Sequence, residues 1–557
     1  MAGEKSELGR SALILVLLAA PAAGQTEAVR FSDRAREWGL TQAGRSGSQE
    51  KLEIAARPGQ GVCVLDYDGD SDPDLFFVGG GFLDGVKPRG APNRLYRNDG
   101  GSFTEVSAAT GIAAAGGWGF GCASADIDRD GDPDLYVAEL GPNRLYRNDG
   151  GRFVEVAAAQ GAAEPRWSAG AAFADFDRDG WPDLFIANHA VFDPEHPPGE
   201  AGRCPWKGWM VGCGPLAHTP ERSTLLIGLG AGRFQDQTTR AGIDGYKSYG
   251  FQPLAFDADD DGDADLLVAN DSTANHLWRN RGDGRFDEVG LESGLALSED
   301  GRPQAAMGIA LGDVDGDGRL DLTITNFSDD YNTLYRNLGA GFFLDATYPA
   351  GLGEATFAYL GWGTHLFDAD QDGDLDLFVA NGHVWPEAED PASGTWYRQR
   401  NQLFLNRGDG RFVEVTARAG PGFELRESSR GSALLDLEGD GDLDLVIVNQ
   451  DAPPTLLVNQ SKGGHFLAVE LEGTESNRDA LGAKLRLLAG GRTQVRERVG
   501  ADSYLSQSQL REHFGLGAAT QVERLEVVWP SGRRQLLENL EADQVLQLRE
   551  PRAELSD

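Results

Sequence analysis

The sequence predicts an all-β protein, built as a seven-bladed β-propeller followed by a small β-rich domain. Three observations support this prediction. An acidic loop motif occurs seven times, strand-like segments flank every copy in the same order, and the region after Asn459 lacks the motif but keeps an alternating pattern. The chain has 557 residues, which is long for a single hydrophobic core, so at least two domains are expected.

The acidic motif is Asp-x-Asp-x-Asp-Gly-x-x-Asp-Leu with small variations, and we number its copies loops 1 to 7. Their starts are separated by 60, 49, 82, 56, 55 and 68 residues, periods that are typical of a propeller or another repeat array. The predicted metal ligands are the carboxylates at positions 1, 3, 5 and 9, counted from the first Asp. They are Asp66, Asp68, Asp70 and Asp74; Asp126, Asp128, Asp130 and Asp134; Asp175, Asp177, Asp179 and Asp183; Asp257, Asp259, Asp261 and Asp265; Asp313, Asp315, Asp317 and Asp321; Asp368, Asp370, Asp372 and Asp376; and Asp436, Glu438, Asp440 and Asp444.

Carboxylates this close together repel one another, and a hard divalent cation removes the repulsion. Ca²⁺ accepts six to eight oxygen ligands at roughly 2.3–2.6 Å in tolerant geometry, whereas Mg²⁺ demands a stricter octahedron. A Gly at position 6 permits the curl that brings positions 1, 3 and 5 to one point. The sequence therefore predicts about seven Ca²⁺ ions. Ser71 replaces the Gly of loop 1 and Glu438 the second Asp of loop 7, so these two sites are expected to empty first.

The segments around each loop predict four antiparallel strands per repeat. An apolar segment leads into the loop, and a run such as LFFV or LYVA leaves it. Leu-Tyr-Arg-Asn or a relative, a Gly-rich turn and Phe-x-Glu-Val follow. Residues 29–33 resemble a fourth strand without its first three, and residues 456–459 a third strand without its fourth. The first segment is therefore expected to complete the last blade and close the ring, and an open solenoid is the alternative.

Composition agrees with this interpretation. The formal net charge is −38, and 34 of the 88 acidic residues lie in the seven loops, without which the charge would be −4. So acidic a chain is not expected to bind nucleic acid passively. Phe, Tyr and Trp number 26, 12 and 11, too many for a disordered chain. Glycine, at 75 residues, is about twice its usual ~7% share.

The N-terminus predicts export. Lys5 and Arg10 precede the apolar run 12–20 and the small residues 21–24, which is the order of a secretory signal peptide. The run is too short to span a bilayer, and no later stretch is long and apolar enough. We therefore expect cleavage near residues 22–24, no membrane span, and a secreted, periplasmic or extracellular protein.

Four cysteines are present. Cys204 and Cys213 close a short loop, CPWKGWMVGC, and are expected to form a disulfide in an exported protein. Cys63 and Cys122 each lie in an apolar segment just before an acidic loop. We expect that second pair to be buried free thiols.

The acidic loops resemble the calcium-binding FG-GAP or VCBS repeats of integrin alpha-subunit propellers and of secreted bacterial proteins. The resemblance covers roughly residues 29–460 and implies a main-chain oxygen at position 7 as a further ligand. Beyond it, HFGLG and VVWPSGR resemble the ASPIC/UnbV domain. The combination is similar to the cartilage acidic protein-like family, which implies extracellular binding or adhesion. The expected organisation is a signal peptide (1–24), the propeller (25–460), the ASPIC/UnbV domain (461–550) and a tail (551–557).

A candidate ligand face is expected on the propeller rim opposite the acidic loops. Aromatic side chains around a concave surface suit sugars, peptides or flat apolar ligands, so an extracellular protein, peptide or glycan is the expected partner. The alternative is that these residues only pack between blades. The candidates are Trp118, Trp167, His189, Tyr249, Trp362, His383 and Trp385.

A metal-dependent enzyme is the alternative function. His189 and His383 follow equivalent strands of two blades, and with Asp193 or Glu387 they would suit a transition metal. The chain has no HExxH, GxSxG or P-loop motif. The sequence therefore favours a binding module over an enzyme.

Overall fold

The structure is a computed structural model that describes residues 29–113 and 116–552. The predicted signal peptide lies outside the described residues. The regular secondary structure of the described part is almost entirely β-strand, as predicted, and the few helices among the described residues are single turns.

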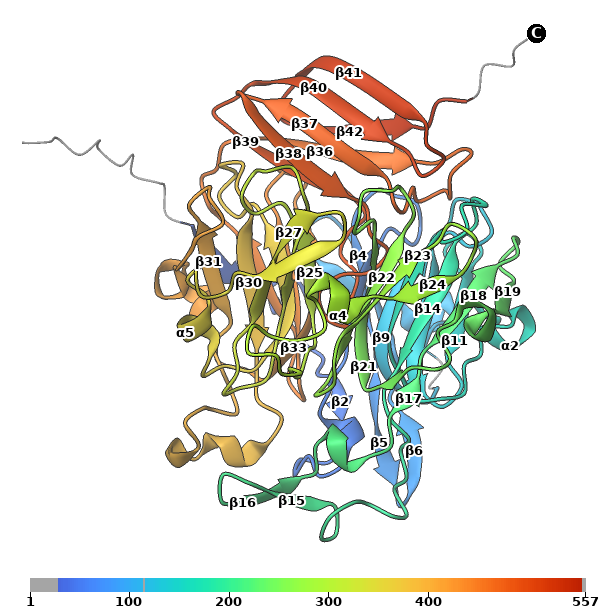
Figure 1. The fold of residues 1–557 in the computed structure, drawn as a ribbon, viewed down its shortest axis with the longest axis vertical. Coiled ribbons are helices and arrows are strands. Elements are labelled where there is room, and N and C mark those ends of the chain that lie inside the picture. Colours follow the sequence, from blue (N-terminus) through green and yellow to red (C-terminus); the bar gives the residue numbers. More distant parts are fainter. Residues whose placement is uncertain (1–28, 114–115, 553–557) are drawn as a thin grey trace, which may run out of the picture.

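Residues 31–459 form seven four-stranded antiparallel sheets, which are the blades of the propeller (Figure 1). Blades 1 to 3 comprise β3 (Val62–Leu65), β4 (Asp74–Phe77), β7 (Arg94–Asn98) and β8 (Phe103–Glu105); β9 (Trp118–Ala125), β10 (Asp134–Leu140), β11 (Arg144–Asn148) and β12 (Phe153–Glu155); and β13 (Ser168–Ala174), β14 (Asp183–Asn188), β18 (Thr224–Gly228) and β19 (Phe234–Asp236). Blades 4 to 6 comprise β21 (Gly250–Phe256), β22 (Asp265–Asn270), β23 (His276–Asn280) and β24 (Phe286–Glu288); β25 (Ile309–Gly312), β26 (Asp321–Ile324), β27 (Thr333–Gly339) and β28 (Phe342–Asp345); and β29 (Gly361–Phe367), β30 (Asp376–Asn381), β31 (Gln402–Asn406) and β32 (Phe412–Glu414). Single-turn helices follow the outer strands of blades 1 to 5: α1 (Ser107–Thr110), α2 (Ala157–Gln160), α3 (Thr238–Ala241), α4 (Gly290–Ser293) and α5 (Gly353–Thr356).

The seventh blade closes the ring with strands from both ends of the repeat region. It contains β33 (Ser429–Leu435), β34 (Asp444–Asn449) and β35 (Thr455–Asn459), and β1 (Phe31–Asp33) pairs antiparallel with β35. β33 also lies against β3 of blade 1. The predicted closure is confirmed, and the outer edge of β35 is paired rather than open.

The C-terminal region forms a separate two-sheet domain over the rim that carries the acidic loops (Figure 1). One sheet contains β39, β36 and β42, the other β38, β37, β40 and β41, and Trp529, Leu485 and Phe514 are among the residues buried between them. The strand bounds are β36 (His465–Glu472), β37 (Lys484–Ala489), β38 (Arg492–Glu497), β39 (Glu512–Gly517), β40 (Gln521–Val528), β41 (Arg534–Glu541) and β42 (Gln544–Arg549).

The connection between β38 and β39 enters the central channel of the propeller, and we name residues 500–509 the channel segment. It contacts the innermost strand of all seven blades. Leu505 N–H, for example, donates to Gln252 Oε1 at 2.7 Å, and Val62 N–H donates to Ser506 Oγ at 3.1 Å. The side chains of Tyr504 and Leu505 are fully buried at its tip. The remaining blades are contacted through Ser124, Phe173, Ile309, Thr364 and Ser432.

Glycines on the innermost strands make room for this segment. A Cβ on Gly61 would lie 1.7 Å from Leu505 O, and one on Gly431 would lie 2.6 Å from Ser506 Oγ. Part of the high glycine content is therefore explained by backbone passing close to backbone inside the channel.

Candidate functional site

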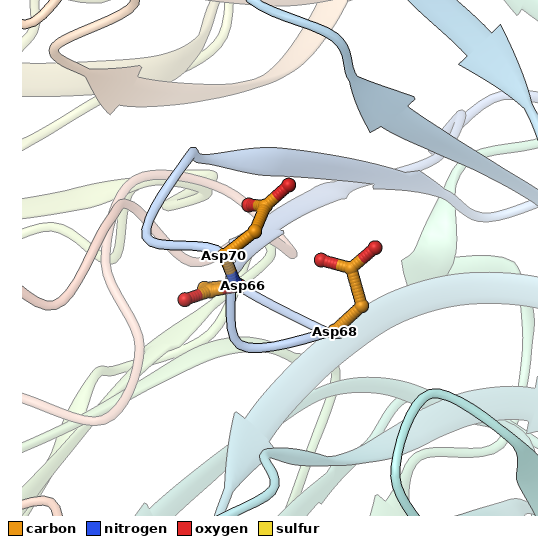
Figure 2. Close-up of side chains that lie close together, drawn as sticks. All are labelled: Asp66, Asp68 and Asp70. Atoms are coloured by element: carbon orange, nitrogen blue, oxygen red, sulfur yellow. The ribbon is translucent and has the colours of Figure 1, made fainter.

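Each acidic loop joins the first two strands of its blade, so all seven lie on one rim, the loop rim. Figure 2 shows loop 1, where Asp66, Asp68 and Asp70 project from one tight curl between β3 and β4. Carboxylate oxygens of these three residues lie within 4.8 Å of one another, close enough to share a metal ion. Equivalent groups occur in loops 2 to 5, formed there by positions 1, 3 and 9.

The first Asp of each loop organises the curl by accepting backbone N–H groups. In loop 1, Asp66 Oδ1 accepts from Gly69 and Asp70 at 2.8 and 3.1 Å, and Asp66 Oδ2 accepts from Ser71 at 2.9 Å. The backbone is left-handed at position 6 of all seven loops, where Ser71 has φ 74°. It is also left-handed at position 4, which sequence reasoning missed because Arg, Asp and Gln occupy it in four loops.

The Asp at position 9 is buried and connects the loop to the third strand. In loop 2, Asp134 Oδ2 accepts from the N–H of Ile127 at 2.9 Å, and Asp134 Oδ1 accepts from the N–H of Asn148 at 2.7 Å. The Asn of the Leu-Tyr-Arg-Asn run is thus part of the loop architecture. Burial raises the pKa of Asp134 to about 8. A charged carboxylate is therefore unfavourable at this position unless a cation is bound next to it.

Several loop carboxylates keep one buried oxygen without any hydrogen-bond partner among the described residues. Six of the seven stand at positions 1 and 3. In Asp126 and Asp175 the other oxygen, Oδ2, accepts a loop N–H, from Gly131 and Gly180. Buried acceptors are rarely left unpaired, so the unpaired oxygens fit a cation held by the loop. They are Oδ1 of Asp126, Asp128, Asp175, Asp259, Asp370, Asp436 and Asp442.

The C-terminal domain lies on the same loops and reaches them with basic side chains. Arg478 Nε lies 3.2 Å from Asp126 Oδ2, and Lys484 Nζ lies 2.8 Å from Asp257 Oδ2. Both contacts are made to Oδ2 of an Asp at position 1. In Asp126 the other oxygen, Oδ1, is the one without a hydrogen-bond partner among the described residues. The domain therefore covers the loop rim while the loop interior keeps acceptors for an ion.

The opposite rim carries the predicted ligand-face candidates, and all seven are buried. Trp118, Trp167, Tyr249, Trp362 and Trp385 belong to one aromatic cluster that includes Tyr504 and Leu505 of the channel segment. Most of their surface is thus used in packing. Trp362, Trp385 and His189 also line a cavity, described below.

The two histidines lie in separate aromatic surroundings. His189 stacks on Phe251 with ring centroids 4.4 Å apart, and burial lowers its pKa to about 3. His383 Nε2 lies 3.2 Å from Ser328 Oγ, and its Nδ1 accepts from the N–H of Trp385 at 3.2 Å. Both His383 nitrogens are engaged, so this residue offers no lone pair to a metal.

The acids predicted to complete that metal site are directed elsewhere. Asp193 Oδ2 pairs with His196 Nδ1 at 2.9 Å, and Glu387 Oε1 lies 3.9 Å from Arg203 Nη1. The transition-metal arrangement expected for an enzyme is therefore not formed by these groups.

Both cysteine pairs are disulfides. Cys204 and Cys213 close the hairpin of β15 (Arg203–Trp206) and β16 (Trp209–Gly212). Cys63 and Cys122 join β3 to β9, so the prediction of buried free thiols is wrong. The two residues lie 59 apart in sequence, and only the ring brings their Cα atoms to 6.1 Å. Disulfides are typical of proteins from oxidising compartments.

The hairpin belongs to residues 199–217, which we name the strap. It leaves blade 3 and crosses the opposite rim, projecting away from the C-terminal domain in Figure 1. The ring centroids of Trp206 and Trp385 lie 4.9 Å apart, and Lys207 Nζ lies 2.6 Å from Asp329 Oδ2. Arg57 Nη1 donates to Gly212 O at 3.1 Å. The strap is therefore fastened to blades 5 and 6 and to the segment before blade 1.

A chamber of about 430 Å³ lies between the strap and the inner end of the channel. Aromatic and aliphatic side chains dominate its walls, including Phe251, Phe327 and Trp362. The polar side chains on the walls are Arg57, His189, Asp271 and Ser272. Tyr504 supports the chamber from behind, with its ring 4.8 Å from Trp362 and 5.5 Å from Phe251.

The blades and their acidic loops define a β-propeller whose loops carry carboxylate groups that could hold metal ions. The chain belongs to the FG-GAP repeat family: the FG-GAP-like repeat model matches residues 66–137, 126–186, 257–324, 313–379 and 392–447, more than half of the chain. The ASPIC and UnbV model matches residues 473–555. The family resemblance stated from the sequence is confirmed.

The chain is also similar to cartilage acidic protein 1. It is 26% identical to the human protein over 333 residues, which is 56% of this chain and 45% of the relative. It is 26% identical to the Xenopus tropicalis protein over 283 residues, 48% of this chain and 40% of the relative. The matched segments thus span less than half the length of these relatives.

Solved structures with a related arrangement are distant. An Agrocybe aegerita lectin that recognises non-reducing terminal N-acetylglucosamine has a TM-score of 0.38 and 18% identity, over 70% of this chain and 88% of the lectin. A rhamnogalacturonan lyase from Bacillus licheniformis has a TM-score of 0.39 and 12% identity, over 81% and 77%. At this similarity neither carries an argument about the ligand. Within the described residues, no helix is long and apolar enough to cross a membrane.

Proposed function

We propose that this chain is a secreted calcium-binding propeller protein that binds an extracellular protein, peptide or glycan on its opposite rim. The predicted signal peptide and the two disulfides support export. The FG-GAP repeats and the ASPIC/UnbV domain support an extracellular binding role.

The observation that most strongly supports calcium binding is the set of unpaired buried carboxylate oxygens at positions 1 and 3 of the loops. Carboxylates at positions 1, 3, 5 and 9 would hold the ion, with Glu438 at position 3 of loop 7. Bound Ca²⁺ would supply only structural charge neutralisation. Positions 1 and 9 already accept loop and strand N–H groups, so these residues hold the curl in a shape ready for the ion.

Calcium binding is tested by counting ions. Elemental analysis of protein dialysed against Ca²⁺, together with calorimetric titration of chelated protein, should find about seven ions per chain. Loops 1 and 7 should release theirs at the lowest EGTA concentration. Protein that retains no calcium after buffer exchange into metal-free solution, and takes up none on titration, would contradict the proposal.

The binding role has its own test. Calcium-saturated protein applied to arrays of glycans and matrix proteins should be retained without turning the ligand over. Replacement of exposed strap residues, such as Leu216→Asp, should weaken retention, whereas Leu536→Asp on the C-terminal domain should not. Equal loss in both variants would show that the ligand does not use the opposite rim.

A further inference from the structure

The chamber beneath the strap has the size and walls of a small-molecule site. Its volume of about 430 Å³ falls within the ~300–1,000 Å³ range that is typical of ligand pockets. Phe251, Phe327, Trp362 and Trp385 supply aromatic wall. A ligand with a flat or branched apolar body can be enclosed here at little polar cost.

One residue of the chamber wall, Asp271, carries a carboxylate that feels the charge of Arg57 but makes no direct ion pair with it. Asp271 follows directly after β22, and its carboxylate receives one hydrogen bond, from Ser272 Oγ at 2.8 Å. Among the described residues it has no ion-pair partner. Burial raises the pKa of Asp271 to about 6, although the Ser272 hydrogen bond and the charge of Arg57 lower it. The carboxylate is therefore charged at neutral pH and has one donor, Ser272 Oγ, where it could accept several.

The two buried guanidinium groups near the chamber are already satisfied. Arg57 donates to the carbonyl oxygens of Glu53, Leu52, Gly212 and Cys213. Arg430, stacked 4.2 Å over Trp362, also donates mainly to carbonyl groups. These cations hold the strap and the channel end in place, so an anionic ligand would find few free donors.

A further polar group on the wall, the imidazole of His189, has an unpaired nitrogen: its Nδ1 has no hydrogen-bond partner among the described residues. A sugar would bring many hydroxyl groups against mostly apolar walls, and unpaired buried hydroxyls are costly. A ligand with a single compact group of donors and an apolar body fits the walls better.

We propose that the chamber binds a small organic ammonium ion, with Asp271 as its anionic partner and the aromatic walls around its apolar body. An ammonium group supplies up to three donors and one positive charge at a single atom, and aromatic faces attract cations. This inference rests on the proposed binding role of the opposite rim and adds to it a small ligand held beneath the strap.

The test is a charge series in which the 2-phenylethyl group is kept and its polar end is changed. Calorimetric titration of the calcium-saturated full chain uses 2-phenylethylamine, 2-phenylethanol and 3-phenylpropionate. The ammonium should bind at least tenfold more tightly than the alcohol, with the carboxylate weakest. Equal binding of amine and alcohol, or tightest binding of the carboxylate, overturns the proposal.

Variants connect that result to the chamber. Asp271→Asn keeps the shape of the side chain and should reduce amine affinity at least tenfold while leaving alcohol affinity unchanged. The exposed Asp300→Asn is the matched control and should change neither. Ala305→Trp fills the chamber wall and should abolish binding of all three probes. Amine binding that survives both chamber variants contradicts the assignment. Protein that retains glycans or matrix proteins on the strap but binds no probe contradicts this inference alone.

Discussion

The two ends of the propeller channel are closed by different means. On the loop rim, charge dominates: acidic loops face basic side chains of a separate domain, such as Arg478 and Lys484. On the opposite rim, an insertion of blade 3 crosses over aromatic side chains. A disulfide closes its hairpin, and it is fastened by Arg57, which donates to a strap carbonyl, and by the ion pair of Lys207 with Asp329. The loop rim is therefore a charged surface with carboxylate groups close enough to share ions, whereas the opposite rim holds a mostly aromatic chamber beneath the strap.

The largest expected effect is the loss of thermal stability when EGTA removes Ca²⁺ from the loop rim, which should leave the opposite rim least affected. Because the loop carboxylates repel one another without Ca²⁺, EGTA should lower the thermal midpoint by more than about 10 °C. Hydrogen exchange should show lost protection in loops 1 to 7 and in residues 473–512, with the strap affected least. Excess Mg²⁺ should not restore the midpoint. An unchanged thermal midpoint would show that Ca²⁺ does not stabilise the loop rim.

The channel segment connects the rims, and Gly61 tests that connection. Gly61→Ala places a Cβ 1.7 Å from Leu505 O, so the backbone must move apart, at a cost of about 3 kcal/mol or more in free energy of unfolding. Gly245→Ala is the control, because nothing lies within 4 Å of its added Cβ. Urea titration measures both. Equal stability of the two variants would show that the channel segment is not seated as described.

Substitution of Asp271 by Asn should change stability in the opposite direction to the same substitution in an acidic loop. The folded-state pKa of Asp271, about 6, is above the ordinary value of 3.8, so the charged carboxylate costs stability, and that cost grows as pH rises from about 4 to about 6. Asp271→Asn should therefore stabilise the calcium-loaded protein by roughly 1–3 kcal/mol above pH 6 and by nothing near pH 4.

Asp313→Asn, at position 1 of loop 5, should destabilise the protein at neutral pH, since it removes a predicted calcium ligand. Chemical unfolding across pH compares the two variants. Destabilisation by both would mean that Asp271 is a structural residue rather than a ligand group.

The smallest effect lies within the loop rim. Ser71 adopts φ 74° where six other loops have Gly, so Ser71→Gly should relieve strain and raise stability by about 0.5–1 kcal/mol. Gly318→Ser in loop 5 is the reciprocal change and should lower stability by a similar amount. Calcium titration should show tighter binding in the first variant. If Ser71→Gly weakens binding, the serine contributes to the site.

Local patterns predicted most of the propeller. Each loop is a contiguous segment whose ligands converge within nine residues, and each blade is assembled from neighbouring strands, so periodicity and turn residues were sufficient. Closure by residues 29–33 was predictable for the same reason, because an incomplete blade at each end leaves one complementary strand. The Cys63–Cys122 disulfide was not, since it depends on two first strands lying side by side in the ring.

The acidic loops, the four-stranded repeat and the family of the C-terminal domain could be predicted without a structure, because residues close together in the chain encode them. What closes the channel depends instead on contacts between distant segments that exist only in the folded molecule. The run SYLSQSQL carries no local signal for insertion, yet its polar side chains satisfy backbone groups on inner strands that come from distant segments. Likewise Asp271 carries no local signal, because its surroundings form only where the strap and blades 4 to 6 meet. There its carboxylate lines the chamber with a single hydrogen-bond donor, Ser272, among the described residues.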